Sequence, residues 1–328
     1  MTTLRESTLR EQLYDRRRRL EAAMVGFDET AQLQNLLQEV DSALSRIDDG
    51  SFGLCEVCHD TIEADRLLAD PLVRFCLDHL TQSERRALER DLDLAARIQG
   101  ALLPQRHLEF GGWEIHYRYE PAGPVSGDYC DVVVPGVDSE DLYFVFGDVS
   151  GKGISASILM SHLKAIFRGL IELGLPLDEL VARANRLFCE STIATHYATL
   201  VCGRVTRSGQ LEVCNAGHLP PLLVQGKVVT PLPATGLPVG LFSSGDYSLK
   251  KMQVGSGGLL FLYTDGLSEA RDNSDEEYGD ARLGALLARH PNTGAEMLTQ
   301  ACLEDLAAFQ AGAPRNDDLA IMAIRRMP

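Results

Sequence analysis

The chain has 328 residues, a formal net charge of −16 and 45 % hydrophobic residues. This length allows one large domain with one or two small ones, and the apolar content is sufficient for a buried core. A chain this acidic is a poor candidate for direct nucleic-acid binding, which depends on Lys and Arg neutralising phosphates, and a better one for binding metal cations.

No apolar run approaches the roughly 18 residues that a membrane span needs. The first segment, MTTLRESTLREQLYDRRRRL, lacks the apolar core of a signal peptide. We therefore expect a cytoplasmic protein without a membrane partner. Five cysteines scattered through apolar segments agree with this compartment, because such residues are typically buried free thiols (Cys130, Cys189, Cys202, Cys214, Cys302).

Residues 1–50 predict an antiparallel helical hairpin. Gly26 can end the first helix, and Asp28 or Thr30 can cap the second. Apolar residues of the second helix repeat with spacings of 4, 3, 4 and 3, as on the seam of a coiled coil (Leu33, Leu37, Val40, Leu44, Ile47).

Residues 51–82 contain a cysteine cluster with the spacing Cys55-x2-Cys58-x17-Cys76-x2-His79. Two knuckles of thiolate and imidazole ligands suit one structural, tetrahedral zinc ion. His59 is a rival to His79, although the two-residue gap favours His79. The segment GSFGLCEVCHDTIEADRLLADPLVRFCLDH resembles the DksA/TraR-type zinc finger, with His59 in place of a glycine and His79 in place of the last cysteine.

Residues 83–104 predict a single linker helix that Pro104 closes. Its seam again follows spacings of 4, 3, 4 and 3 (Leu88, Leu92, Ala95, Gln99, Leu102). About two heptads fit, short of the three to four that define a coiled coil.

From residue 105 to 328, short β-rich runs alternate with turn residues. Helical stretches are expected around 154–171, 177–192 and 280–310. Strands in runs with helices in pairs favour an α+β fold, in which helices pack on antiparallel sheets.

The stretch YFVFGDVSGKGISA has the outline of a phosphate-binding loop, but its spacing does not fit one. Three residues separate Gly147 from Gly151, and Lys152 is followed by Gly153, whereas a Walker A loop needs four residues and then Gly-Lys-Ser/Thr. A kinase or NTPase is therefore excluded. Asp148 would also repel a phosphate unless a cation lay between them.

Three more acidic positions adjoin apolar strands: Asp128, Asp265 and the pair Asp317 and Asp318. One aspartate beside a glycine is usually a turn residue. A buried carboxylate is costly unless it is paired or bound to a metal, so the set predicts a site for two Mn²⁺ or Mg²⁺ ions, which prefer carboxylate ligands.

Residues from about 110 to 328 resemble the PPM (type 2C) metal-dependent phosphatases of the SpoIIE- and RsbU-like branch. The resemblance rests on seven ordered pieces: IQGALLP, GPVSGDYCDV, FGDVSGKGISASILMS, CNAGHLPPLL, ATGLPVGL, LYTDGLSEA and RNDDLAIM. It implies a β-sandwich flanked by helix pairs, after the helical hairpin and the small zinc finger. We accordingly divide the chain at 1–50, 51–82, 83–104 and 105–328.

The resemblance also implies roles for individual residues. Asp148 would bridge the two ions, with help from the backbone carbonyl of Val149. Asp128 would hold one ion, and Asp265 and Asp317 the other, with Asp318 as the rival to Asp317. Further assignments stay open or secondary: Asp131 as a support for the ligands, Lys152 as a phosphate ligand or a solvated residue, and His218 as a proton donor or a structural turn residue.

The implied activity is hydrolysis of phosphoserine or phosphothreonine by a protein phosphatase, with a phosphorylated STAS-domain anti-sigma-factor antagonist as substrate. The N-terminal module would regulate it, and homodimers would form through the helical segments. The alternative is a non-enzymatic transcription regulator that binds RNA polymerase through the hairpin and the finger.

Overall fold

The structure is a computed structural model that describes residues 3–26, 31–80, 82–136, 138–192, 196–315 and 317–328. The chain divides into two compact units, Met1–Asp91 and Leu92–Pro328. The division falls inside the helix α4 (Gln82–Leu102). Asp28 and Thr30, the candidate caps, lie outside the described residues.

The first unit contains a pair of packed helices, α1 (Thr3–Gly26) and α2 (Ala31–Asp49). Two shorter helices follow, α3 (Ala64–Ala69) and the 3-10 helix η1 (Leu77–His79). Leu9 and Leu13 of α1 are buried in one core with Val40 and Leu44 of α2, which belong to the predicted apolar seam of the second helix. The same core includes Cys55 and other residues of the cysteine-rich segment, so the hairpin and that segment share one interior.

The second unit contains two antiparallel sheets. The six-stranded sheet has the order β1-β2-β11-β10-β7-β8, and the five-stranded sheet has the order β3-β4-β5-β6-β9. The strands of the first sheet are β1 (His107–Phe110), β2 (Trp113–Glu120), β7 (Leu222–Gln225), β8 (Val228–Pro231), β10 (Leu259–Tyr263) and β11 (Leu319–Arg326). Those of the second are β3 (Asp128–Val133), β4 (Asp141–Val149), β5 (Ala198–Thr206), β6 (Gln210–Ala216) and β9 (Lys250–Gln253).

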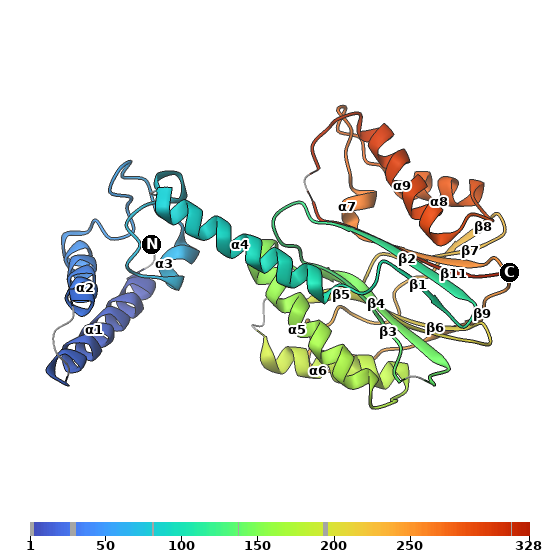
Figure 1. The fold of residues 1–328 in the computed structure, drawn as a ribbon, viewed down its shortest axis with the longest axis horizontal. Coiled ribbons are helices and arrows are strands. Elements are labelled where there is room, and N and C mark those ends of the chain that lie inside the picture. Colours follow the sequence, from blue (N-terminus) through green and yellow to red (C-terminus); the bar gives the residue numbers. More distant parts are fainter. Residues whose placement is uncertain (1–2, 27–30, 81, 137, 193–195, 316) are drawn as a thin grey trace. The chain divides into compact units, whose positions relative to one another are not determined.

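Helices cover both outer faces of this sandwich (Figure 1). The pair α5 (Gly153–Ile171) and α6 (Leu177–Ser191) packs on the five-stranded sheet, and α8 (Asp280–Arg289) and α9 (Ala295–Gln310) pack on the six-stranded sheet. The predicted α+β sandwich flanked by helix pairs is thereby confirmed. The central strands are buried on both faces, which explains why β4, β10 and β11 read as nearly continuous apolar runs.

Strand β4 shows how the sequence sorts residues between these layers. Phe144 and Phe146 point into the core between the sheets, whereas Tyr143 and Val145 point to the helices α5 and α6. The alternation follows from the two-residue period of a strand. It places Asp148, two positions after Phe146, on the inter-sheet face at the end of the strand.

Some local elements differ from the expectation. The predicted helical region 280–310 is two helices, because Pro291 has no backbone N–H to continue the first one. Strands β1 and β9 and the short helix α7 (Asp265–Ser268) were not predicted. Helix α5 is long and apolar enough to cross a membrane by length and composition, but its apolar residues pack against β3 and β4.

His218 joins the two sheets at one end of the sandwich. Its Nε2 donates to the carbonyl oxygen of Tyr263 on β10 at 3.1 Å, and its Nδ1 accepts from the hydroxyl of Thr199 on β5 at 3.0 Å. A carbonyl can only accept, so Nε2 carries a proton, and because burial lowers the pKa of His218 the ring is neutral at pH 7 and its Nδ1 is the acceptor. Both nitrogens are occupied, which supports the structural role of His218.

Because the imidazole of His218 is buried, we expect the folded state to lose stability at acidic pH. Burial lowers the pKa of His218 to about 4 from 6.5. Its contribution to stability is therefore present above pH 6.5 and is lost as the pH falls toward 4, by about 2 kcal/mol at pH 5. Urea unfolding at pH 7.5 and 5 measures the loss. His218→Gln should lower the free energy of unfolding at pH 7.5 and reduce its loss between pH 7.5 and 5. If the variant lost as much stability over this range as the wild type, His218 would not be the group responsible.

Candidate functional site

Two of the predicted acidic residues are direct neighbours in the five-stranded sheet. Asp128 at the start of β3 pairs in register with Asp148 near the end of β4. Asp128 is buried and accepts a hydrogen bond from the Thr264 hydroxyl at 3.1 Å. Thr264 follows β10, so this bond connects the two sheets beside the carboxylates.

The other acidic residues come from the six-stranded sheet. Asp265 begins α7 directly after β10, and Asp317 lies just before β11. Gly266 permits the two segments to approach, because a Cβ at this position would lie 1.8 Å from the carbonyl oxygen of Asp318. Gly127 has the same role beside β4, where a Cβ would lie 2.9 Å from the carbonyl oxygen of Val149. Each sheet thus contributes two carboxylates to one end of the sandwich.

Asp317 and Asp318 have different surroundings. Both carboxylate oxygens of Asp318 accept backbone N–H groups, from Ala122 at 2.8 Å and Gly127 at 3.1 Å. Asp318 thereby holds the loop that leads to Asp128. Asp317 accepts from Lys152 Nζ at 2.9 Å, and its side chain is 41 % exposed. Asp317 is the acid of this pair that remains accessible to a cation.

The carboxylates raise one another's pKa. Burial, followed by the charge of Asp148, raises the pKa of Asp128 well above its usual range. Burial, followed by the charge of Asp265, raises the pKa of Asp148 to about 7. Burial and the charge of Asp317 also raise the pKa of Asp265. Clustered charges of one sign in a partly desolvated place favour a cation that neutralises them.

The donor set therefore fits a hard divalent cation, since it consists of carboxylate oxygens. Within the described residues, no three carboxylates bring an oxygen each within 4.8 Å of one another. The four aspartates come from both sheets, so an ion that contacts only part of the set would need water to complete its coordination shell.

Asp131 does not belong with these four aspartates. It lies three residues after Asp128 and so faces the opposite side of β3, where it is fully buried. Lys164 Nζ lies 2.7 Å from its carboxylate, and Arg168 donates two hydrogen bonds of 2.8 Å. Asp131 fastens α5 to the sheet, so the expected support of the ligands is wrong.

A cavity of about 150 Å³ adjoins the acidic residues. Asp265 and Asp317 line it together with two arginines that the sequence analysis missed, Arg271 and Arg315. Arg315 pairs with Glu120, and Arg271 pairs with Asp275 and Glu277. The signal that could have drawn attention to Arg315 is its place two residues before Asp317. The cavity thus has two guanidinium groups, each already paired with carboxylates, beside Asp265 and Asp317.

Gln99 of α4 also belongs to the surroundings of this site. The side chain is buried, donates to the carbonyl oxygen of Ser126 at 2.7 Å and accepts from the N–H of Ser126 at 3.0 Å. The Ser126 hydroxyl in turn accepts from the N–H of Asp128 at 3.0 Å. In the sequence, Gln99 is the one polar residue on the apolar seam of the linker helix, and this exception was the signal for a specific polar contact.

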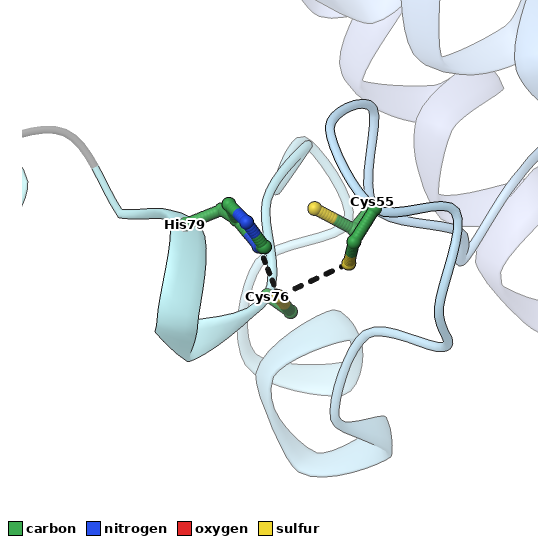
Figure 2. A group of neighbouring side chains, drawn as sticks. Cys55, Cys76 and His79 are labelled. Carbon is green, nitrogen blue, oxygen red and sulfur yellow. Dashed lines mark hydrogen bonds between the residues drawn. The ribbon is translucent and has the colours of Figure 1, made fainter.

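The cysteine cluster forms a second candidate site in the first unit. One ligand atom each from Cys55, Cys58, Cys76 and His79 lies within 4.8 Å of the others. Figure 2 shows Cys55, Cys76 and His79 converging, with a ring nitrogen of His79 directed at Cys76. The sulfurs of Cys58 and Cys76 are 3.8 Å apart. Tetrahedral zinc with bonds of about 2.3 Å needs a sulfur separation of about 3.8 Å, so the group fits zinc.

His59 lies outside this group of four ligands. It is exposed and has a φ of 60°, a backbone conformation that glycine adopts easily. The residue thus occupies a turn position at which the resembling family has a glycine.

Metal removal tests the second site. We expect Cys76→Ser to lose the zinc, and to expose the core of the first unit because Cys55 and Cys76 belong to it. His79→Cys should keep one zinc per chain, since it retains a ligand. Elemental analysis of the purified proteins measures zinc, and near-UV circular dichroism follows the packing. Full zinc content in Cys76→Ser would refute the ligand set.

Comparisons with known proteins find a family match in each of the two parts of the chain that carry these sites. Residues 138–327 match Stage II sporulation protein E (SpoIIE), and residues 50–78 match the prokaryotic dksA/traR C4-type zinc finger. The match to the finger ends just before His79, the position at which this chain departs from four cysteines.

Two curated relatives cover most of the chain. Protein IcfG of Synechocystis is 27 % identical over 265 residues, which are 72 % of this chain and 41 % of IcfG. Phosphoserine phosphatase RsbU of Bacillus subtilis is 27 % identical over 243 residues, which are 73 % of this chain and 71 % of RsbU. The chain therefore spans less than half of IcfG and about seven tenths of RsbU.

Solved structures share the fold. The SiaA-PP2C domain of Pseudomonas aeruginosa aligns with a TM-score of 0.64 at 21 % identity, over 75 % of this chain and 99 % of that domain. The RsbU and RsbW domains of a Mycobacterium tuberculosis protein align with a TM-score of 0.54 at 25 % identity, over 66 % of this chain and 60 % of that one. Since the SpoIIE match extends over more than half of the residues, the chain belongs to the SpoIIE family, and it carries a dksA/traR-type zinc finger before the family domain.

Proposed function

We propose that the chain is a metal-dependent protein serine/threonine phosphatase. The observation that carries the proposal is the convergence of Asp128 and Asp148 from one sheet with Asp265 and Asp317 from the other. The similarity to the phosphoserine phosphatases RsbU and RsbP of Bacillus subtilis supports it, at 27 % identity in each case.

The four aspartates would hold a pair of Mn²⁺ or Mg²⁺ ions. In this assignment Asp148, with the Val149 carbonyl, would serve both ions, Asp128 would hold one, and Asp265 and Asp317 would hold the other. Asp318 keeps the loop before Asp128 in place through its two backbone hydrogen bonds. Such a pair supplies Lewis acidity for the attack of water on a phosphate monoester.

No protein nucleophile is needed for this reaction. No cysteine in the sequence is followed by five residues and an arginine, so the chain has no phosphocysteine motif. Arg271 and Arg315 on the cavity wall are placed to orient an anionic substrate beside Asp265 and Asp317. We propose a phosphorylated STAS-domain protein as that substrate, which the kinship with RsbU and RsbP supports.

Substitution of one ligand tests the activity. We expect the wild type with Mn²⁺ to release phosphate from p-nitrophenyl phosphate and from a phosphoserine peptide. Asp265→Asn should lose activity about 100-fold or more, because one ligand charge is removed. Asp246→Asn, at an exposed position, is the matched control and should keep full activity. Equal rates for Asp265→Asn and wild type would refute the role of Asp265, and an inactive wild type would refute the proposal.

We further propose that the N-terminal module regulates the site through α4. The helix starts directly after the zinc-finger segment and carries Gln99, which holds Ser126 next to Asp128. A shift of α4 would therefore change the backbone that presents a metal ligand. Leu94 and Ile98 on the same helix are 50 % and 56 % exposed, which supports pairing of two copies through the helical segments.

Gln99 provides the test of this coupling. Gln99→Ala would leave the N–H and carbonyl of Ser126 unpaired, and we expect it to weaken the apparent Mn²⁺ affinity about tenfold and to lower stability by about 2 kcal/mol. Mn²⁺ titrations of p-nitrophenyl phosphate hydrolysis and thermal unfolding measure these effects. Arg97→Ala, at an exposed position on the same helix, is the control. An unchanged Mn²⁺ dependence in Gln99→Ala would show that α4 does not act on the ligand loop.

A further inference from the structure

A group of exposed apolar side chains lies near the acidic residues. We define the apolar rim as Tyr197, Leu237, Leu241 and Phe242, which are 38 %, 52 %, 42 % and 58 % exposed. Single exposed apolar residues are normal on a protein surface, whereas a group of large ones commonly marks a binding surface.

Hydrogen bonds connect the rim to the strand end that carries Asp148. Ala198 and Val239 exchange two backbone hydrogen bonds of 2.8 Å, which brings Tyr197 beside the segment with Leu241. The N–H of Tyr197 donates to Ser150 Oγ at 3.0 Å, and the N–H of Ser150 donates to the carbonyl of Tyr197 at 2.9 Å. Ser150 is two residues beyond Asp148, about 7 Å along an extended chain. The rim therefore borders the proposed active site.

The backbone beneath the rim is firmly held. Asn185, which is buried, donates to the carbonyl oxygens of Phe242 at 2.9 Å and Ser243 at 3.4 Å. Its side-chain oxygen accepts the N–H of Gly240 at 2.8 Å. A Cβ at position 240 would lie 2.7 Å from the ring of Phe188, so the segment packs closely on α6. The exposed side chains are thus presented by a preorganised backbone, which lowers the entropic cost of binding.

Leu237, Leu241 and Phe242 of the rim belong to an uncharged part of a strongly acidic chain. Residues 228–245 contain no Asp, Glu, Lys, Arg or His, although 24 % of the whole chain is charged. A phosphorylated substrate is an anion and is repelled by a protein with a net charge of −16. An uncharged, apolar border lets such a substrate approach and adds apolar contacts that do not depend on charge.

We propose that the apolar rim binds the apolar surface that flanks the phosphoserine of a protein substrate. The proposal rests on the proposed phosphatase function and adds the class of substrate that the site selects. A substrate seated on the rim has its phosphoserine next to the strand end with Asp148. A small phosphate ester does not extend to the rim and gains nothing from it.

Two synthetic peptides test this selectivity on the full-length protein. Both carry one phosphoserine and a fluorescent label; in one the flanking residues are Leu and Val, and in the other they are Ser and Gly. Anisotropy gives the dissociation constants, and phosphate release with Mn²⁺ gives kcat and KM. We expect the wild type to bind the apolar peptide about tenfold more tightly and to show the same ratio in KM.

Phe242→Ser should reduce the tenfold ratio to about one, in binding and in KM. Leu173→Ser is the matched control: Leu173 is 59 % exposed and lies beyond the far end of α5, so the ratio should stay tenfold. The proposal would be overturned if the wild type bound the two peptides equally well. It would also be overturned if Phe242→Ser still bound the apolar peptide tenfold more tightly. If Phe242→Ser weakened binding of the apolar peptide but the wild type released phosphate from neither peptide, the rim would still be a docking surface. That result would refute the phosphatase function instead. Dissociation of a dimer by Phe242→Ser, with an unchanged ratio, would assign the rim to a second copy of the chain.

Discussion

Repulsion among carboxylates at one end of an apolar sandwich is the constraint that organises this protein. Burial and mutual charge raise the pKa of Asp128, Asp148 and Asp265, so the folded chain keeps these groups together at a cost in free energy. The large apolar core between the sheets and under both helix pairs offsets that cost. A divalent cation at the proposed site would relieve the repulsion, and its binding would then add to the stability of the fold.

Several contacts hold the two sheets at a fixed separation around the carboxylates. Thr264 bonds across to Asp128, and His218 bonds to Tyr263 on one side and Thr199 on the other. Gly266 lets Asp265 approach the segment with Asp317. Each of these residues is buried or closely packed, so the positions of the ligands depend on the packing of the whole sandwich rather than on one flexible loop.

The first unit differs from the second in that its apolar core overlaps with a candidate metal site. Its core is small, and two residues of that core, Cys55 and Cys76, are also in the group of four that fits zinc. In a unit of this size a bound metal contributes directly to folding, because the unfolded chain does not preform the site. Helix α4 continues from this unit into the second, where Gln99 holds the loop before Asp128. One helix therefore runs from the unit with the candidate zinc site to the backbone of a proposed metal ligand.

The features that depend on local pattern follow from the sequence alone. The spacing of Cys55, Cys58, Cys76 and His79 indicated the zinc finger, and apolar strands ending in Asp148 and Asp265 indicated an α+β sandwich with acidic strand ends. The tertiary structure alone decided which groups share a surface. It placed Asp131 on the opposite face of β3 from Asp128, occupied both oxygens of Asp318 with backbone N–H groups, and brought Tyr197 beside the distant segment with Phe242. The physical reason is that a strand reverses face at each residue and that contacts between sheets join residues far apart in the chain, so neither follows from the identity of a residue and its neighbours.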